Sequence, residues 1–79
     1  MRLDKYLKVS RLIKRRTVAC EACTAGKVTV NGKVAKPSLD VKIGDVISLT
    51  FGEKVVSVSV VSLSEHVRKE EAEAMYKPV

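Results

Sequence analysis

The sequence has few of the residues on which chemistry in proteins usually depends. Its 79 residues include one histidine, two cysteines and four glycines. No Ser/His/Asp set, no pair of carboxylates in an apolar setting and no phosphate-binding glycine loop can be assembled from them. We therefore expect that the chain is not an enzyme and that it binds no cofactor and no metal.

Aromatic residues are scarce as well, since Tyr6, Phe51 and Tyr76 are the only ones. Proteins that read single-stranded nucleic acids stack several bases on aromatic side chains. The composition argues against that mode of binding. It leaves room for binding through phosphates and through the shape of a folded nucleic acid.

Long apolar runs are absent too. The longest, Val55 to Leu63, is interrupted by three serines, whereas a membrane-spanning helix needs about 20 apolar residues. There is no secretory apolar region, and two cysteines suit a reducing compartment. The length allows one domain with a small core. We expect a soluble, cytoplasmic monomer with a single domain over residues 1–79 and no contact with membranes.

Positive charge is concentrated in the first fifth of the chain. Residues 1–16 contain seven basic residues and one acid, while residues 17–79 contain eight of each, so the net charge of +6 lies entirely in the first segment. A surface that only promotes solubility normally mixes both signs. A basic segment beside a neutral one is typical of a protein that binds a polyanion such as RNA, although charge alone does not exclude DNA.

The apolar spacing predicts an α+β fold, with two short N-terminal helices packed on a small, mainly antiparallel sheet and a C-terminal helix. In the first helix Leu3, Tyr6 and Leu7 form an apolar stripe, and in the second Ala19, Ala22 and Cys23 do so. The predicted helices cover residues 1–9, 14–25 and 65–76, and the predicted strands cover 27–30, 33–35, 46–51 and 56–60. We expect the last few residues to fray and His66 to lie on the surface of the final helix.

The start of the second helix breaks a local rule. Lys14, Arg15 and Arg16 lie where the helix dipole is positive, and cations there are unfavourable. Free N–H groups at a helix start favour a phosphate, and arginine can bond two phosphate oxygens at once. We interpret this segment as an anion site.

Asp4 is the only acid in the basic segment, beside a ridge formed by Arg2, Lys5 and Lys8 at a spacing of three. Two roles remain open for it. Its carboxylate could be a solvated partner of the helix dipole, or it could hold an arginine in place by a two-pronged contact.

Cys20 and Cys23 have the spacing of a redox or metal-binding pair. Redox pairs of this kind usually lie at a helix start, where the dipole lowers the thiol pKa, and zinc would need two further ligands. Because this pair falls in the middle of a predicted helix beside small residues, we expect both cysteines to serve packing.

Several of these segments together resemble the alpha-L RNA-binding domain. They are Arg2-Leu3-Asp4-x-x-Leu7, Arg16-x-x-Ala19, Gly26-x-Val28-x-Val30-Asn31-Gly32 and Val41-x-x-Gly44-Asp45-x-Ile47. The likeness covers residues 2–50, with residues 51–79 as an additional strand and helix. Leu12 to Arg16 and Lys36 to Ser38 resemble the branch of the bacterial heat-shock protein of fifteen kilodaltons and its short Gram-positive relatives, which act in ribosome-associated quality control.

The resemblance implies a function. Such proteins bind free large ribosomal subunits, through ribosomal RNA and tRNA, while a tail-adding protein extends a stalled chain with alanine. Charge and resemblance together give the candidate RNA contacts: Arg2, Asp4, Lys5, Lys8, Arg11, Lys14, Arg15, Arg16, Lys27, Lys33 and Lys36. Alternatives are a module that recruits an RNA-modifying enzyme, a small structural ribosomal protein and a thiol redox protein.

Two positions depart from the family pattern. The family often has serine where this chain has Arg15, so the second helix lacks its usual cap, and it often has glycine near Arg11.

Overall fold

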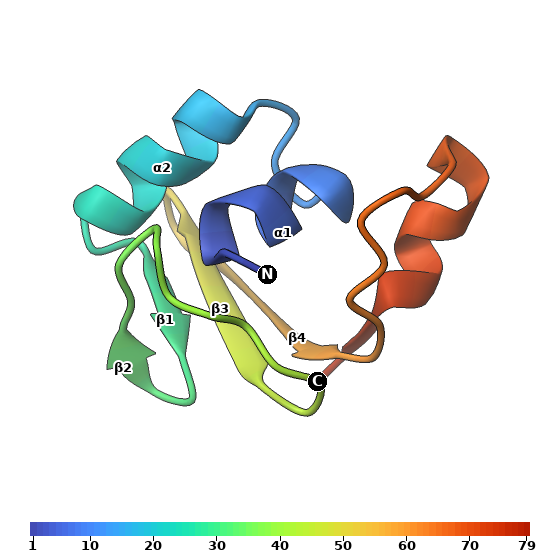
Figure 1. The fold of residues 1–79 in the computed structure, drawn as a ribbon. Coiled ribbons are helices and arrows are strands. Elements are labelled where there is room, and N and C mark those ends of the chain that lie inside the picture. The colour runs from blue at the N-terminus through green and yellow to red at the C-terminus, as the bar shows by residue number, and fades with distance from the viewer.

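The computed structural model describes residues 1–79 as an α+β fold (Figure 1). Two α-helices, α1 (Leu3–Val9) and α2 (Arg16–Thr24), are followed late in the chain by a 3-10 helix, η1 (Lys69–Met75). The strands are β1 (Val28–Val30), β2 (Lys33–Val34), β3 (Val46–Phe51), β4 (Lys54–Val60) and β5 (Tyr76–Pro78). They form one antiparallel sheet in the order β2-β1-β3-β4-β5. The predicted fold class is confirmed.

The core lies between the helices and one face of the sheet. In α1, Leu3, Tyr6 and Leu7 are each 0% exposed, so the predicted stripe is confirmed. In α2, Ala19 and Cys23 are buried. These side chains belong to a cluster of 15 buried residues that also takes alternate side chains from β1, β3 and β4. Small residues on α2 allow the two helices to pack closely over the sheet.

The glycine at the end of α2 and the Asn-Gly pair of the first hairpin form the predicted helix end and turn. Gly26 has a φ of 77°, its N–H donates to Cys23 O, and the Lys27 N–H donates to Ala22 O. This pair of bonds ends α2 as a Schellman motif. Asn31 and Gly32 have φ values of 53° and 83°, as a tight hairpin turn requires. The turn joins β1 to β2 and so fixes the edge of the sheet.

The end of the chain differs from the prediction. The predicted helix over residues 65–76 is a 3-10 helix that begins at Lys69 and has no side-chain cap bond. The last residues form β5 instead of fraying, with Tyr76 opposite Val60 and Pro78 opposite Val58. The physical reason is that β4 has a free edge, and pairing with it satisfies backbone groups that a frayed end would leave to water.

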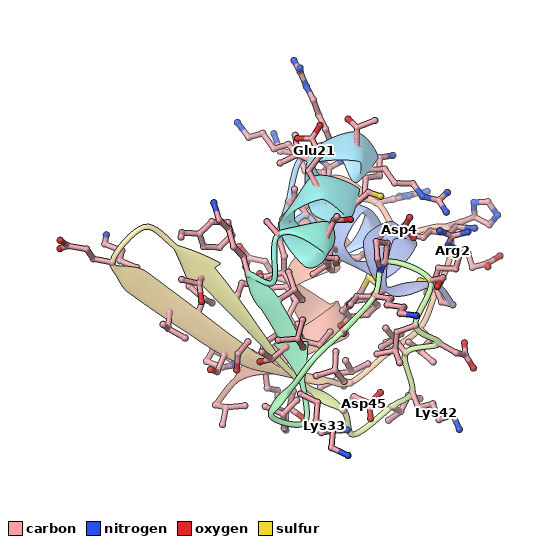
Figure 2. All side chains as sticks on the ribbon, turned by 90° about the vertical axis from the view of Figure 1, so that its left-hand side faces the viewer. Arg2, Asp4, Glu21, Lys33, Lys42 and Asp45 are labelled. Carbon is pink, nitrogen blue, oxygen red and sulfur yellow. The ribbon has the colours of Figure 1, made fainter.

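The β3–β4 hairpin extends beyond the helices, as Figure 2 shows. We expected alternate burial along the last predicted strand, and Val58 and Val60 are indeed 2% exposed each. Val56, on the same face, is 39% exposed, and Phe51 at the hairpin end is 48% exposed. The sheet is therefore longer than the helix layer that covers it.

Candidate nucleic-acid interface

One buried acid holds two arginines at the N-terminal ends of the two α-helices. The Asp4 side chain is 5% exposed, while those of Arg2 and Arg16 are 53% and 48% exposed. Arg2 Nε donates to Asp4 Oδ1 at 3.2 Å and Arg2 Nη2 to Asp4 Oδ2 at 3.3 Å. Arg16 Nη2 donates to Asp4 Oδ1 at 3.4 Å. Two guanidinium groups are thereby oriented while about half of each side chain stays in water.

These contacts decide between the two roles that the sequence left open for Asp4. Burial by itself raises the pKa of the carboxyl, but hydrogen bonds from Arg16, from the Lys5 N–H and from Arg2 outweigh it. The pKa of Asp4 is consequently lower than its ordinary value. Asp4 is therefore ionised at neutral pH and positions arginine, as the two-pronged alternative predicted.

The start of α2 is open, whereas the start of α1 is not. In α1 the N–H groups of Leu3 and Asp4 donate to carbonyl groups of the 37–39 loop. In α2 the N-cap residue, Arg15, makes no side-chain cap bond, and the first turn has no acid. The N–H groups of Arg16, Thr17 and Val18 have no acceptor within the protein. The free donors expected at this position are thus present, next to the Arg16 guanidinium.

The other basic residues predicted as contacts are spread over three places. Lys8, Arg11 and Lys14 line one cleft. Lys5 lies beside that cleft, where its Nζ is 3.3 Å from Glu65 Oε1. Arg15 is exposed at the start of α2.

Three further predicted contacts lie on the loops and the sheet. Lys27, at the end of α2, lies on a separate hollow that also includes Phe51. Lys33 lies at the far end of the first hairpin from Asp4, as Figure 2 shows. Lys36 is exposed and precedes Pro37, whose carbonyl accepts the Asp4 N–H at 3.1 Å. The structure therefore brings Lys36 near the Arg2–Asp4–Arg16 cluster but keeps Lys33 away from it.

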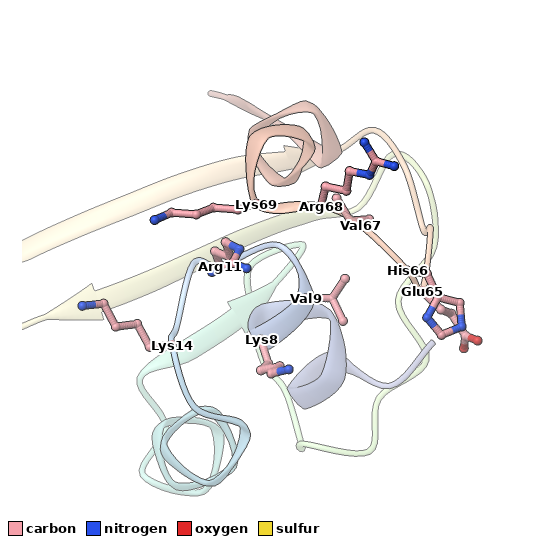
Figure 3. Close-up of a pocket in the computed structure, with 9 residues that line it drawn as sticks. All are labelled: Lys8, Val9, Arg11, Lys14, Glu65, His66, Val67, Arg68 and Lys69. Carbon is pink, nitrogen blue, oxygen red and sulfur yellow. The ribbon is translucent and has the colours of Figure 1, made fainter.

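The cleft also contains residues that sequence reasoning missed. Its volume is about 850 Å³, and its second wall consists of Glu65 to Lys69, with Arg68 and Lys69 on it (Figure 3). His66 is exposed as expected, but it lies on this wall before η1 and not on a helix. The only signal in the sequence was the adjacent Arg68-Lys69 pair, and neighbouring acids obscured it.

Arg11 is the strained residue of the site. Its φ is 63°, a left-handed conformation, and its N–H donates to Lys8 O at 3.1 Å just after α1 ends. Glycine takes this conformation without a steric penalty. A residue other than glycine therefore adds backbone strain at this turn.

The two cysteines are free thiols, and the buried setting of Cys23 does not favour reactivity. Cys23 is 2% exposed, and burial, together with the charge of Asp4 and of Cys20, raises the pKa of its thiol to about 11. Cys20 is partly buried. A thiol with a raised pKa is a poor nucleophile. The packing role expected for Cys23 fits its place in the core.

Two further properties of the structure concern ligands and membranes. No three His, Cys, Asp or Glu side chains come together in a way that could hold a metal ion. None of the helices has the length and apolar character needed to cross a bilayer.

Comparison with known proteins identifies the class of this domain: residues 1–47 match the S4 domain, and the chain belongs to that family. Two similar curated proteins are called RQC P-site tRNA stabilizing factor. The one from Halalkalibacterium halodurans is 57% identical over 98% of this chain and 88% of its own length. The one from Bacillus subtilis is 55% identical over 96% of this chain and 88% of its own length.

A solved structure extends the likeness to the fold. The trimeric structure of heat shock protein 15 from Vibrio cholerae has a TM-score of 0.93, with 36% identity over all of this chain and 81% of that one. The resemblance to the alpha-L domain and to the heat-shock branch is thereby confirmed.

Proposed function

We propose that this chain is a non-catalytic, RNA-binding factor of ribosome-associated quality control that holds tRNA on the large ribosomal subunit. The observation that carries the proposal is the cluster of Asp4 with Arg2 and Arg16, in which a buried carboxylate orients two half-exposed guanidinium groups. A guanidinium held in a fixed direction suits two-pronged binding of a phosphate. The open start of α2 supplies backbone donors beside it.

The relatives support the biological setting of the proposal. Curated proteins that match nearly the whole chain carry the name RQC P-site tRNA stabilizing factor. We further propose that the protein acts in the cytoplasm on free large subunits that bear peptidyl-tRNA and that it contacts ribosomal RNA there. In this proposal it cooperates with a protein that adds an alanine tail to the stalled chain.

A sucrose-gradient profile of cell lysate tests the proposal, with this protein and tRNA detected in each fraction. The Arg16→Ala variant is compared with Lys33→Ala, which removes the same charge far from Asp4. We expect substoichiometric co-migration with free large subunits that carry tRNA, lost in Arg16→Ala and largely kept in Lys33→Ala. The loss of affinity should be about ten- to a hundredfold, the range for a hydrogen bond between charged groups.

Other profiles would contradict the proposal and identify a rival. Equal presence on all mature ribosomes would indicate a structural ribosomal protein. Absence from ribosomal fractions, together with copurification of an RNA-modifying enzyme, would indicate a targeting module.

A further inference from the structure

The cleft of about 850 Å³ lies outside the Arg2–Asp4–Arg16 cluster and is formed by two segments that are distant in the sequence. One wall is the end of α1 and the connection to α2, and the other is the segment that leads into η1. Figure 3 shows the side chains of both walls. The lining residues are Lys8, Val9, Arg11, Lys14, Glu65, His66, Val67, Arg68 and Lys69.

The cleft has a large excess of positive charge. Five of its nine lining residues are lysine or arginine, and one is an acid. None of these five cations has a carboxylate within 4.0 Å, because none of them takes part in an ion pair of the structure. The acid, Glu65, is already paired with Lys5. The unbalanced charge is unfavourable in the free protein and favours an anionic ligand.

The lining also argues against a small-molecule ligand. Pockets for small molecules are mostly apolar with a few polar groups, whereas only Val9 and Val67 are apolar here. Both valines are partly buried and pack against the core. A ligand with charge along its length fits this arrangement better than a compact apolar one.

Both walls are held in place by contacts within the protein. Tyr6 OH donates to Met75 O at 2.8 Å in the core, and the N–H groups of Val61 and Ser62 donate to the same carbonyl. The Lys5–Glu65 pair ties the second wall to α1 on the surface. The cations of the two walls are therefore brought together before any ligand binds, which lowers the entropy lost on binding.

We propose that this cleft binds the sugar-phosphate backbone of an RNA strand, with Arg68 and Lys69 as contacts beyond the residues that match the S4 domain. The inference rests on the proposed RNA-binding function and extends it to the C-terminal segment. Arg2 at the N-cap of α1 and Lys5 and Lys8 on α1 recur at a spacing of three between the Asp4 cluster and the cleft, with Lys5 paired to Glu65, so one RNA molecule can contact cations at both places. This arrangement favours RNA over an acidic protein segment.

The test uses the double variant Arg68→Ala/Lys69→Ala. Its matched control is Lys54→Ala/Lys77→Ala, which removes two exposed cations outside the cleft. Binding to purified large subunits that carry tRNA is measured by co-sedimentation at several salt concentrations. We expect about a tenfold loss of affinity in the cleft variant and a log–log salt slope shallower by about 1.4–1.8, the contribution of two phosphate contacts. The control should stay within about twofold of the wild type.

A second variant is expected to raise RNA affinity instead of lowering it. Glu65→Gln removes the negative charge of the cleft, while the amide oxygen can still accept the Lys5 bond that holds the wall, so affinity should rise by about two- to fivefold, as expected for one exposed charge pair. A variant with a damaged fold is not expected to bind RNA more tightly. Thermal melting of all variants should match that of the wild type, which shows that they are folded.

The outcomes separate this inference from the proposed function. If the cleft variant binds like the wild type while Arg16→Ala does not bind, the cleft is not an RNA site, although the proposed function stands. If the cleft variant loses binding of a polyglutamate peptide and keeps binding of RNA, the ligand is an acidic protein segment and the inference is wrong. If the wild type itself does not bind, the proposed function fails first.

Discussion

Asp4 and Arg16 belong to different helices and lie 12 positions apart in the sequence, yet Asp4 Oδ1 and Arg16 Nη2 are 3.4 Å apart. The same carboxylate holds Arg2 by two hydrogen bonds. One buried acid therefore fixes the direction of two half-exposed cations on two elements. Under the proposed function, this negative charge strengthens the binding of a negative ligand, because the fixed orientation of the two guanidinium groups outweighs the repulsion.

The salt dependence of RNA binding counts the phosphate contacts. If about five lysine and arginine side chains meet phosphates, the log–log plot of affinity against salt should have a slope of about −3.5 to −4.5. Co-sedimentation or fluorescence anisotropy at several salt concentrations gives the slope directly. A slope near −1 would show that most of the basic surface stays solvated.

The stability of the protein should depend on Asp4 in acid. The pKa of Asp4 is lowered on folding, so its ionised form stabilises the folded state above the ordinary pKa, and that stabilisation disappears as pH falls through the lowered value. Urea unfolding of the wild type and of Asp4→Asn is measured from neutral pH to about pH 3. The wild type should be more stable at neutral pH and lose that advantage in acid. An advantage that is constant with pH would contradict the assignment.

Tyr6 should matter at the opposite end of the pH scale. Burial, with a further effect of Tyr76, raises the pKa of Tyr6 to about 12. A raised pKa means that the neutral phenol stabilises the fold below about pH 10 and that this stabilisation is lost as pH rises through about 12. Tyr6→Phe should unfold less steeply in alkali than the wild type, as followed by circular dichroism.

The same variant should be less stable at neutral pH. It lacks the hydrogen bond to Met75 O, and such a bond contributes about 0.5–1.5 kcal/mol. Met75 O keeps two backbone donors, so no buried acceptor is left unpaired. An unchanged melting temperature would show that the packing of the C-terminal segment does not depend on this bond.

Arg11 should show a conflict between stability and binding. Arg11→Gly relieves the left-handed backbone strain and should raise the free energy of unfolding by about 0.5–1 kcal/mol. It also removes a cation of the cleft and should weaken RNA binding. Arg11→Ala is the matched comparison, since it removes the charge and keeps the strain. Equal unfolding free energies for the two variants would mean that the backbone is not strained here.

Predictions from the sequence succeeded where structure is determined locally. Gly26 and the Asn31-Gly32 pair need only their own backbone preferences to end a helix and to make a turn. The end of the chain depends on distant partners, since the bond between Tyr6 and Met75 joins residues 69 positions apart. Weak amphipathic spacing over residues 65–76 suggested a longer helix because nothing in the sequence shows that β4 has an edge to be paired.

The candidate site shows the same difference between features set by nearby residues and features set by packing of distant ones. The charge of the first 16 residues and the unusual start of α2 were visible in the sequence, and so was one of the two roles considered for Asp4. The junction of Asp4 with Arg16 was not, because it depends on how α1 packs against α2. Arg68 and Lys69 were missed because residues 17–79 have no net charge, so that a local excess appears only in three dimensions.

The role of Asp4 in orienting Arg2 and Arg16 is tested by the binding of Asp4→Asn to large subunits that carry tRNA. The substitution keeps the shape of the side chain, raises the net positive charge by one and removes the ionised partner of Arg2 and Arg16. We expect affinity to fall by about tenfold, because the two guanidinium groups lose their fixed direction. Affinity equal to or higher than that of the wild type would show that charge alone, and not its orientation by Asp4, governs binding.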